Sequence, residues 1–255
     1  MQEKNNIVII FAGGVGSRLN GADTIPKQFL KVFGKPIIVH TIEQFQRNEN
    51  IDKIYISIVP SHYEYMKELV EYYHLSKVKG ITKGGNTGQD SIYKALKMAQ
   101  IENNEESIVL IHDGVRPHIT QEVINLNIKN TKKYGSAITC TPCYETVLIS
   151  ETGNTPTSVP YRRQTFSAQA PQTFRLGDVI QAHEIERKIN PEYKDIIDTC
   201  TLFKKHGKSP FMIRGNLGNI KITTIEDLYI LRALMRYSED MEAFGFLEKN
   251  KDLVK

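Results

Sequence analysis

Residues 7–31 read IVIIFAGGVGSRLNGADTIPKQFLK, and this stretch predicts the fold of the chain. It begins with five apolar residues, most of them β-branched, as expected of a strand covered on both faces in a parallel sheet. The glycines that follow let the backbone approach a ligand, because glycine lacks Cβ and tolerates positive φ. Successive exposed N–H groups in such a turn favour anions. The stretch therefore predicts an α/β protein with an anion site, to which Arg18 and Lys27 add positive charge.

Three phosphate-binding motifs could explain this turn, and their spacing separates them. A P-loop ends in Gly-Lys-Ser/Thr, which is absent here. The dinucleotide fingerprint G-x-G-x-x-G fits Gly14 and Gly16, but Leu19 stands at its third glycine. What remains is Gly-Gly-x-Gly-Ser-Arg-Leu followed by Pro26-Lys27-Gln28, a series that resembles the nucleotidyltransferases that activate sugars and sugar phosphates.

Length and composition limit the classes of protein that fit. The chain has 255 residues without an internal repeat or a low-complexity linker, so we expect one domain over residues 1–238 and a charged tail over residues 239–255. No apolar run approaches the ~20 residues that cross a bilayer, and the N-terminus lacks a signal-peptide pattern. We therefore expect a cytoplasmic protein without a membrane partner.

The charge pattern bears on the substrate. The net charge is only +4, and Lys and Arg are interspersed with Asp and Glu rather than clustered. This argues against a nucleic-acid partner and favours a small polyanionic substrate.

The rest of the chain alternates strand and helix patterns. Apolar spacing predicts helices over residues 37–46, 176–189 and 225–235, and strands over residues 54–59, 107–111 and 210–214. This order is typical of crossover connections in a parallel sheet. We expect a Rossmann-like nucleotidyltransferase fold, with a mostly parallel sheet flanked by helices and a protruding β-arm.

Two short segments allow more than one interpretation. Residues 84–91 read GGNTGQDS and form either an ordinary loop capped by Asp90 or Ser91, or a second ligand loop. Cys140 and Cys143 form a C-x-x-C motif, but the residues before it read as strand, where positions i and i+3 face opposite sides. With no second cysteine pair, we expect a structural role rather than a zinc site.

The predicted strand over residues 107–111 ends at an acidic residue. Asp113 stands at its carboxyl end, which is where open α/β sheets bind ligands. Taken together with the glycine turn, this place predicts a metal ligand. We interpret the neighbouring His112 as a hydrogen-bonded structural residue.

Six segments in matching order resemble the bacterial cytidylyltransferases that make CDP-polyols, the family of 2-C-methylerythritol 4-phosphate and ribitol 5-phosphate cytidylyltransferases. The segments are residues 12–18, residues 26–28, residues 84–85 with Ser91, residues 112–117, residues 169–174 and residues 219–223. The resemblance covers about residues 7–231. Phe11-Ala12-Gly13-Gly14, Gly114-Val115 and Asp198-Thr199-Cys200 look more like the ribitol enzymes.

The resemblance implies transfer of CMP from CTP to a polyol phosphate, with Mg²⁺ as cofactor. It implies three catalytic cations, eight nucleotide contacts and one metal ligand. These are Arg18, Lys27 and Lys221; Ala12, Gly13, Gly14, Gly16, Gly85, Asn86, Ser91 and Arg116; and Asp113. The chain departs from the family pattern G-G-x-x-R-x-x-S at one position, where Gly88 replaces the arginine. The phosphate or loop contact of that arginine is therefore lost or supplied by another element.

Residues 142–167 predict the arm. They form short β-branched segments separated by turn signals, a pattern typical of a hairpin. An isolated hairpin is marginally stable in water, so the arm must lie against something. In the family the corresponding arm reaches a second subunit, and Thr146 and Arg162 match residues that help to bind the polyol phosphate, with Arg163 as the alternative register. The resemblance thus implies a homodimer.

We favour D-ribitol 5-phosphate as the acceptor, with 2-C-methyl-D-erythritol 4-phosphate as the alternative. The ribitol product would be a precursor of a cell-wall or capsule polysaccharide. A nicotinamide-dinucleotide-binding Rossmann protein is the alternative from another class, and a non-catalytic nucleotide-binding regulator is the third. The Rossmann alternative predicts a glycine near Leu19 and gives Pro26-Lys27-Gln28 no role.

Overall fold

Strand β1 (Asn6–Ala12) lies inside a seven-stranded sheet, between β4 (Lys53–Ile58) and β6 (Ile108–Asp113), and pairs in parallel with both. The computed structural model describes residues 4–14 and 25–243. Val8 and Ile10 of β1 belong to the core on one face of the sheet, whereas the residues between and beside them belong to the core on the other face. The predicted strand buried on both faces is confirmed.

The sheet has the order β5-β4-β1-β6-β8-β7-β9. The four strands not yet placed are β5 (Val78–Lys83), β7 (Ser136–Pro142), β8 (Phe166–Arg175) and β9 (Phe211–Arg214). β5 is parallel to β4 and β9 is parallel to β7, but β8 runs antiparallel to both β6 and β7. The sheet is mostly parallel, as predicted, with one reversed strand near its middle.

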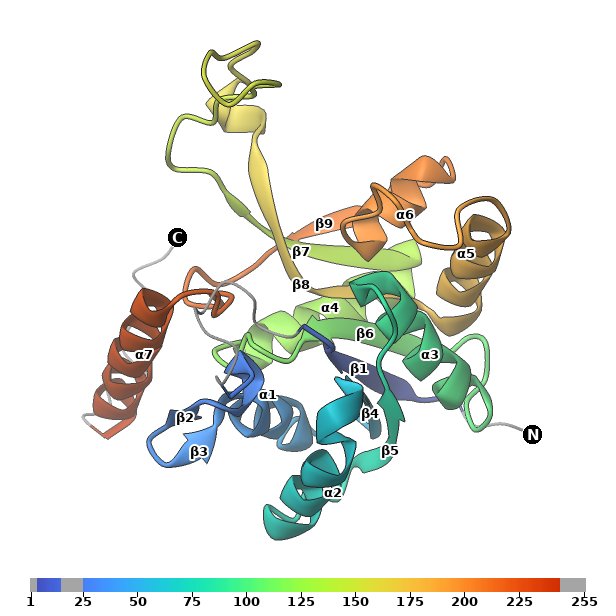
Figure 1. Cartoon of the computed structure of the whole chain (residues 1–255), viewed down its shortest axis with the longest axis vertical. Coiled ribbons are helices and arrows are strands. Elements are labelled where there is room, and N and C mark those ends of the chain that lie inside the picture. The colour runs from blue at the N-terminus through green and yellow to red at the C-terminus, as the bar shows by residue number, and fades with distance from the viewer. Residues whose placement is uncertain (1–3, 15–24, 244–255) are drawn as a thin grey trace.

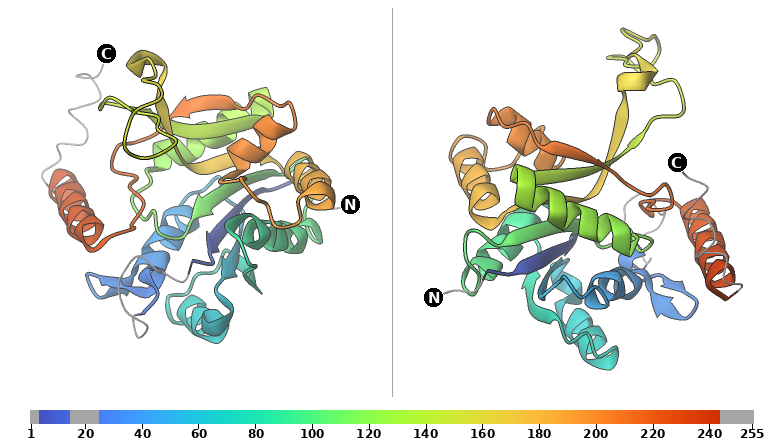
Figure 2. Two further views of the ribbon diagram at one scale, coloured as in Figure 1. Left: turned by 45° about the horizontal axis from the view of Figure 1, so that its top comes forward. Right: turned by 180° about the vertical axis from the view of Figure 1, so that it is seen from behind.

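Helices cover both faces of the sheet (Figures 1 and 2). One face carries α1 (Ile37–Gln46), α2 (Tyr63–Tyr72) and α4 (Gln121–Tyr134), whose apolar residues share one core cluster. The other face carries α3 (Gly88–Gln100), α5 (Leu176–Ile189) and α6 (Thr199–Lys205), which share the second cluster. The predicted α1 and α5 have the observed bounds.

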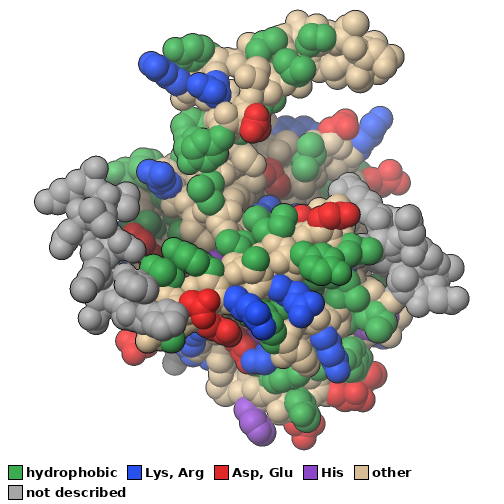
Figure 3. Space-filling model, turned by 90° about the vertical axis from the view of Figure 1, so that its left-hand side faces the viewer, with side chains coloured by type: hydrophobic (Ala, Val, Ile, Leu, Met, Phe, Trp, Pro, Cys, Tyr) green, Lys and Arg blue, Asp and Glu red, His purple; other side chains and the backbone are tan. Residues whose placement is uncertain are grey.

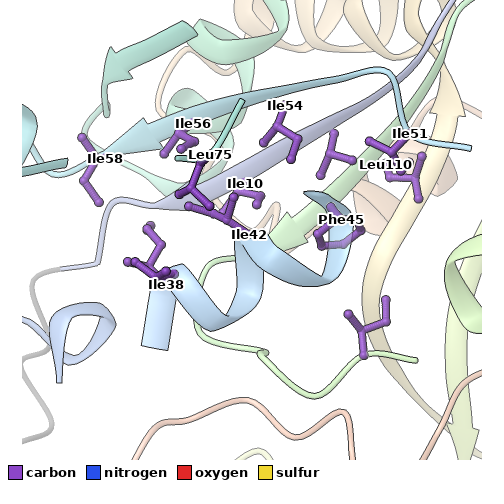
Figure 4. Close-up of a cluster of buried hydrophobic side chains, with 14 of the residues drawn as sticks. Ile10, Ile38, Ile42, Phe45, Ile51, Ile54, Ile56, Ile58, Leu75 and Leu110 are labelled. Carbon is purple, nitrogen blue, oxygen red and sulfur yellow. The ribbon is translucent and has the colours of Figure 1, made fainter. Parts of the chain in front are cut away.

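Helix α1 shows how the first core is built. Ile38, Ile42 and Phe45 recur at helical spacing, are fully buried, and face Ile10 of β1 and Leu110 of β6 (Figure 4). Burying a side chain of this size contributes about 1.5–3 kcal/mol. This packing fixes the strand that leads into the glycine turn.

The arm leaves the sheet between β7 and β8. At its base Pro142 pairs with Phe166, and near its tip an isolated bridge joins Ile149 to Ser158. A short 3₁₀ turn, Arg162–Gln164, precedes β8. The arm stands away from the rest of the molecule (Figures 1 and 3). The predicted hairpin is thus confirmed at its base, while its outer part has little regular pairing.

The C-terminal part contributes helix α7 (Ile225–Ala243), which is longer than the predicted helix over residues 225–235. Thr223, just before it, is held by Asp227, whose Oδ2 accepts hydrogen bonds from the Thr223 N–H at 2.6 Å and its hydroxyl at 2.8 Å. No helix in the described ranges is long and apolar enough to span a membrane.

Candidate active site

The glycine turn at the end of β1 is fastened to the Pro-Lys-Gln segment. Gln28 lies in a 3₁₀ turn, Lys27–Phe29, and is buried. Its Nε2 donates to the Ala12 carbonyl at 2.9 Å and to the Gly14 carbonyl at 3.3 Å. The two parts of the opening motif therefore form one unit that places Lys27 beside the turn.

The second glycine loop leads into α3, and its cap differs from both predicted ones. The Thr87 hydroxyl accepts a hydrogen bond from the Asp90 N–H at 3.0 Å, so Thr87 is the N-cap and the prediction of Asp90 or Ser91 was wrong. The Ser91 side chain instead links Gly85 to Thr87. Its Oγ accepts from the Gly85 N–H at 2.9 Å and donates to the Thr87 carbonyl at 2.9 Å.

Ser91 also brings the two glycine loops together. A Cβ at Gly13 would lie 2.9 Å from Ser91 Oγ, and one at Gly84 would lie 3.1 Å from it, so neither position leaves room for a larger side chain. Ser91 is buried at 1% exposure. It does not line the cavity described below but supports the two loops that do, whereas the resemblance implied that it contacts the nucleotide.

Asp113 lies between two cations at the end of β6. Its Oδ1 is 2.6 Å from Lys221 Nζ, and its Oδ2 accepts from Arg116 Nε at 3.0 Å. Burial alone would raise the pKa of Asp113, but the charges of Lys221 and Arg116 hold that pKa below its usual value. Asp113 is therefore an ionised carboxylate at neutral pH.

His112 is structural, as interpreted from the sequence. It is fully buried, its Nε2 is 3.0 Å from the Arg116 carbonyl, and its ring lies edge-on to Phe45. Burial lowers its pKa to about 4, so the imidazole is neutral. It supports the turn that carries Arg116.

A cavity of about 520 Å³ joins both glycine loops to Asp113. Its wall contains most of the predicted nucleotide contacts together with Lys27 and Lys221. The lining residues are Phe11, Ala12, Gly13, Gly14, Lys27, Gln28, Gly85, Asn86, Thr87, Gly88, Asp113, Val115, Lys221 and Thr223. We call it the first cavity.

A second cavity of about 240 Å³ adjoins the first, because Phe11, Gly88, Asp113 and Lys221 line both. Its remaining wall comes from α3, from β6 and the turn after it, from β8, and from the segment that leads into α6. These residues are Gln89, Ile92, Ile111, Arg116, Ala168, Gln169, Ala170, Gln172, Ile197, Asp198 and Thr199. A Cβ at Gly88 would meet no atom within 4 Å, so this position opens toward the cavities.

Three more of the predicted site residues that the structure describes do not line the first cavity. Arg116 lines the second cavity and not the first, although it was predicted to contact the nucleotide. Thr146 and Arg162 are exposed on the arm and line neither cavity in the described part of this chain. Arg18, with Gly16 of the nucleotide set, lies outside the described residues.

Several residues that form the site were not predicted from the sequence. Thr87 and Thr223 line the first cavity, and Gln172 links β8 to α6, because its Nε2 donates to Asp198 Oδ2 at 2.7 Å. Asp198 in turn caps α6 by accepting from the Thr201 N–H. The sequence feature that could have identified Thr87 is the presence of Asn and Thr in the second glycine loop.

The donor set fits a Mg²⁺ ion held jointly with a nucleotide. In the described ranges no group of three or more His, Cys, Asp or Glu side chains could hold a metal by itself. Mg²⁺ is usually bound by one or two carboxylates together with substrate phosphates. Asp113 is one ionised carboxylate at the rim shared by the two cavities.

The chain matches one protein-family model over residues 6–237, described as IspD, 2-C-methyl-D-erythritol 4-phosphate cytidylyltransferase. It is 44% identical over 241 residues to a ribitol-5-phosphate cytidylyltransferase of Streptococcus agalactiae serotype III, covering 94% of this chain and 99% of that protein. It is 35% identical over 225 residues to a 2-C-methyl-D-erythritol 4-phosphate cytidylyltransferase of Clostridium botulinum strain Okra, covering 88% and 95%.

A solved structure has the same fold. The crystal structure of 4-diphosphocytidyl-2C-methyl-D-erythritol synthase from Anaerococcus prevotii superposes with a TM-score of 0.77 at 26% identity, covering 91% of this chain and 96% of that one.

Proposed function

The chain belongs to the 2-C-methyl-D-erythritol 4-phosphate cytidylyltransferase family, and from this premise we propose that it transfers CMP from CTP to D-ribitol 5-phosphate, releasing pyrophosphate. The observation that carries the proposal is the pair of adjoining cavities that share Asp113 and Lys221. The first has the glycine walls that suit a triphosphate, and the second has room for a short polyol phosphate. The higher identity to a ribitol-5-phosphate enzyme favours ribitol over methylerythritol.

The reaction needs positioning more than proton transfer. The second pKa of a phosphate monoester is near 6, so the acceptor phosphate is largely ionised at pH 7 and needs no general base. One of its oxygens attacks the α-phosphorus of CTP, a new P–O bond forms, and the bond to the bridging oxygen of the leaving pyrophosphate breaks. Lys27 and Lys221, which both line the first cavity, offset the charge that develops.

Asp113 would hold Mg²⁺ together with the phosphates of CTP. The ion would supply positive charge where the triphosphate and the acceptor phosphate meet. Lys221 and Arg116 keep the Asp113 carboxylate ionised and oriented at the shared rim.

Asp113→Asn is expected to raise the Mg²⁺ concentration for half-maximal rate by ~10-fold or more, because one charged oxygen ligand becomes neutral. Rates at saturating substrates should be measured across a Mg²⁺ titration. An unchanged titration curve would remove Asp113 from the metal site.

We propose that the arm completes the acceptor site of a second copy. Thr146 and Arg162 are exposed and remote from the cavities of their own chain, and Tyr144 and Tyr161 present exposed aromatic rings on the same arm. A homodimer would cover these rings and bring Arg162 to the partner's acceptor phosphate.

Mixed dimers of Arg162→Ala and Lys27→Ala chains are expected to recover activity that neither variant has alone, because a shared-site dimer then contains one intact site. Activity of purified, differently tagged heterodimers is the measurement. No recovery would contradict shared sites, and a monomer in light scattering would contradict the arm as a dimer contact.

The proposed function is tested by pyrophosphate release. We expect release to require CTP, D-ribitol 5-phosphate and Mg²⁺ together, with the other nucleoside triphosphates much less effective. The enzyme would work in the cytoplasm, where its product would enter polysaccharide synthesis. Enhanced NADH fluorescence without pyrophosphate release would instead support the nicotinamide alternative, which the family match does not favour.

A further inference from the structure

Asp90 in the first turn of α3 supports the loop that forms one wall of the first cavity. Its Oδ2 accepts from the Asn86 N–H at 3.3 Å, and a Cβ at Gly85 would collide with the Asp90 carboxylate. Gly85 and Asn86 line the first cavity, whereas Asp90 does not. The carboxylate therefore lies directly behind the residues that would face the nucleotide.

Arg187 reaches this carboxylate from a different part of the fold. It lies on α5, and its Nη1 is 2.5 Å from Asp90 Oδ1. Its guanidinium lies over the Tyr93 ring at 4.6 Å and the Tyr193 ring at 5.8 Å from the centroids. Tyr193 is itself buried and its hydroxyl is 2.7 Å from His183 Nδ1. The planar cation thus contacts two aromatic rings as well as the Asp90 carboxylate.

The charge on Asp90 persists at neutral pH. Burial alone would raise the pKa of Asp90, but the hydrogen bond from Arg187 and the positive charge of Lys94 hold that pKa below its usual value. The Asp90 side chain is only 16% exposed, so water screens the Arg187 pair less than it would at the surface.

We propose that Arg187 is a positioning residue for the nucleotide, which acts through Asp90 to hold Gly85 and Asn86 in the conformation that forms the cavity wall. The inference rests on the proposed function in taking CTP as the ligand. Since Arg187 lines neither cavity, it would act without touching substrate. A loop that leaves this conformation binds CTP with an affinity reduced by the fraction of competent chains.

The chain offers a matched control on the same two helices. Lys97 of α3 is 3.3 Å from Glu184 of α5, and both side chains are more than 40% exposed. If Arg187 only helped to join α3 to α5, breaking the Lys97 pair would have a similar effect. If Arg187 positions the loop, Lys97→Ala should leave CTP binding unchanged.

Arg187→Ala is expected to raise the Kd of CTP, measured by calorimetry, by about tenfold. The KM for CTP should rise by a similar factor, while kcat and the KM for the acceptor change much less. Arg187→Lys should restore binding in part, because lysine keeps the charge but not the planar fork. A CTP Kd within about twofold of wild type in Arg187→Ala, or an equal loss in Lys97→Ala, would overturn the proposal. If Arg187→Ala does not fold, Asp90→Asn is the second variant, because it removes the charge that pairs with Arg187. It should also raise the Kd of CTP, and an unchanged Kd would overturn the proposal.

Amide hydrogen exchange of the ligand-free protein separates this proposal from the proposed function. Residues 85–91 should exchange faster in Arg187→Ala than in wild type or Lys97→Ala, since the support beneath the loop is lost. Failure of the wild-type chain to bind CTP would refute the function while leaving the loop support standing. Unchanged exchange at residues 85–91 would refute the loop support itself.

Discussion

Replacing Lys27 with alanine is expected to lower kcat by ~10²–10³ while leaving the fold intact, by analogy with the loss of one preorganised donor to a developing negative charge. Lys27 begins the 3₁₀ turn that Gln28 fastens to the glycine turn, and it lines the first cavity. Phe29, which is buried and stacks on the His62 ring, anchors this turn, so removing the Lys27 side chain leaves the anchor in place.

Lys31→Ala is the control for this variant. Lys31 is exposed, follows the same turn and lines neither cavity, so its loss should leave kcat within about twofold of wild type, as surface substitutions usually do. Steady-state rates with both substrates saturating and thermal melting curves give the comparison. A Lys27→Ala enzyme with near-normal kcat would remove Lys27 from the catalytic set.

The second large effect concerns the acceptor. We expect kcat/KM for D-ribitol 5-phosphate to exceed that for 2-C-methyl-D-erythritol 4-phosphate by ~10⁴-fold, because a site built to hydrogen-bond hydroxyls leaves its own groups unpaired when an analogue lacks them. In the wall of the second cavity, Gln89 and Thr199 each carry a buried oxygen that has no hydrogen-bond partner in the described part of the chain. A straight pentitol offers hydroxyls along its length, whereas methylerythritol carries a methyl branch that requires an apolar niche.

Both acceptors should be measured on one enzyme preparation with CTP saturating. Thr199→Val keeps the shape of the side chain and removes its hydroxyl, so it should narrow the preference for ribitol if Thr199 contributes to it. A preference of the wild-type enzyme for methylerythritol phosphate would overturn the choice of acceptor and leave the cytidylyl transfer standing.

The elements that the sequence predicted well are those with a clear apolar period. β1 and α1 have uninterrupted buried patterns and were placed within one residue of their observed bounds. β5 was missed because its residues are mostly half-buried, and a strand at the edge of a sheet has little apolar signal. The end of α7 was placed too early because its last turns are largely exposed and polar.

The sequence predicted which residues belong to the site but not how they are arranged in space. The motifs identified Lys27, Asp113 and Lys221, and all three line the first cavity. The role of Ser91 could not be predicted from the sequence, because it depends on the distance between two loops that are about 70 residues apart in the chain. The place of Arg116 depends on its hydrogen bond to the Asn219 carbonyl, another contact between distant segments.

The two cavities are built largely from different parts of the sheet and of the chain. The four strands β5-β4-β1-β6 form a continuous parallel unit that is complete by Asp113, and they carry the glycine loops of the first cavity. The chain after Asp113 supplies the arm and more than half of the second cavity's wall, mainly from the reversed β8 and the start of α6. Lys221 lines both cavities. Substitutions in β8 or near the start of α6 can therefore change the wall of the second cavity while the two glycine loops, which come from the chain before Asp113, stay the same.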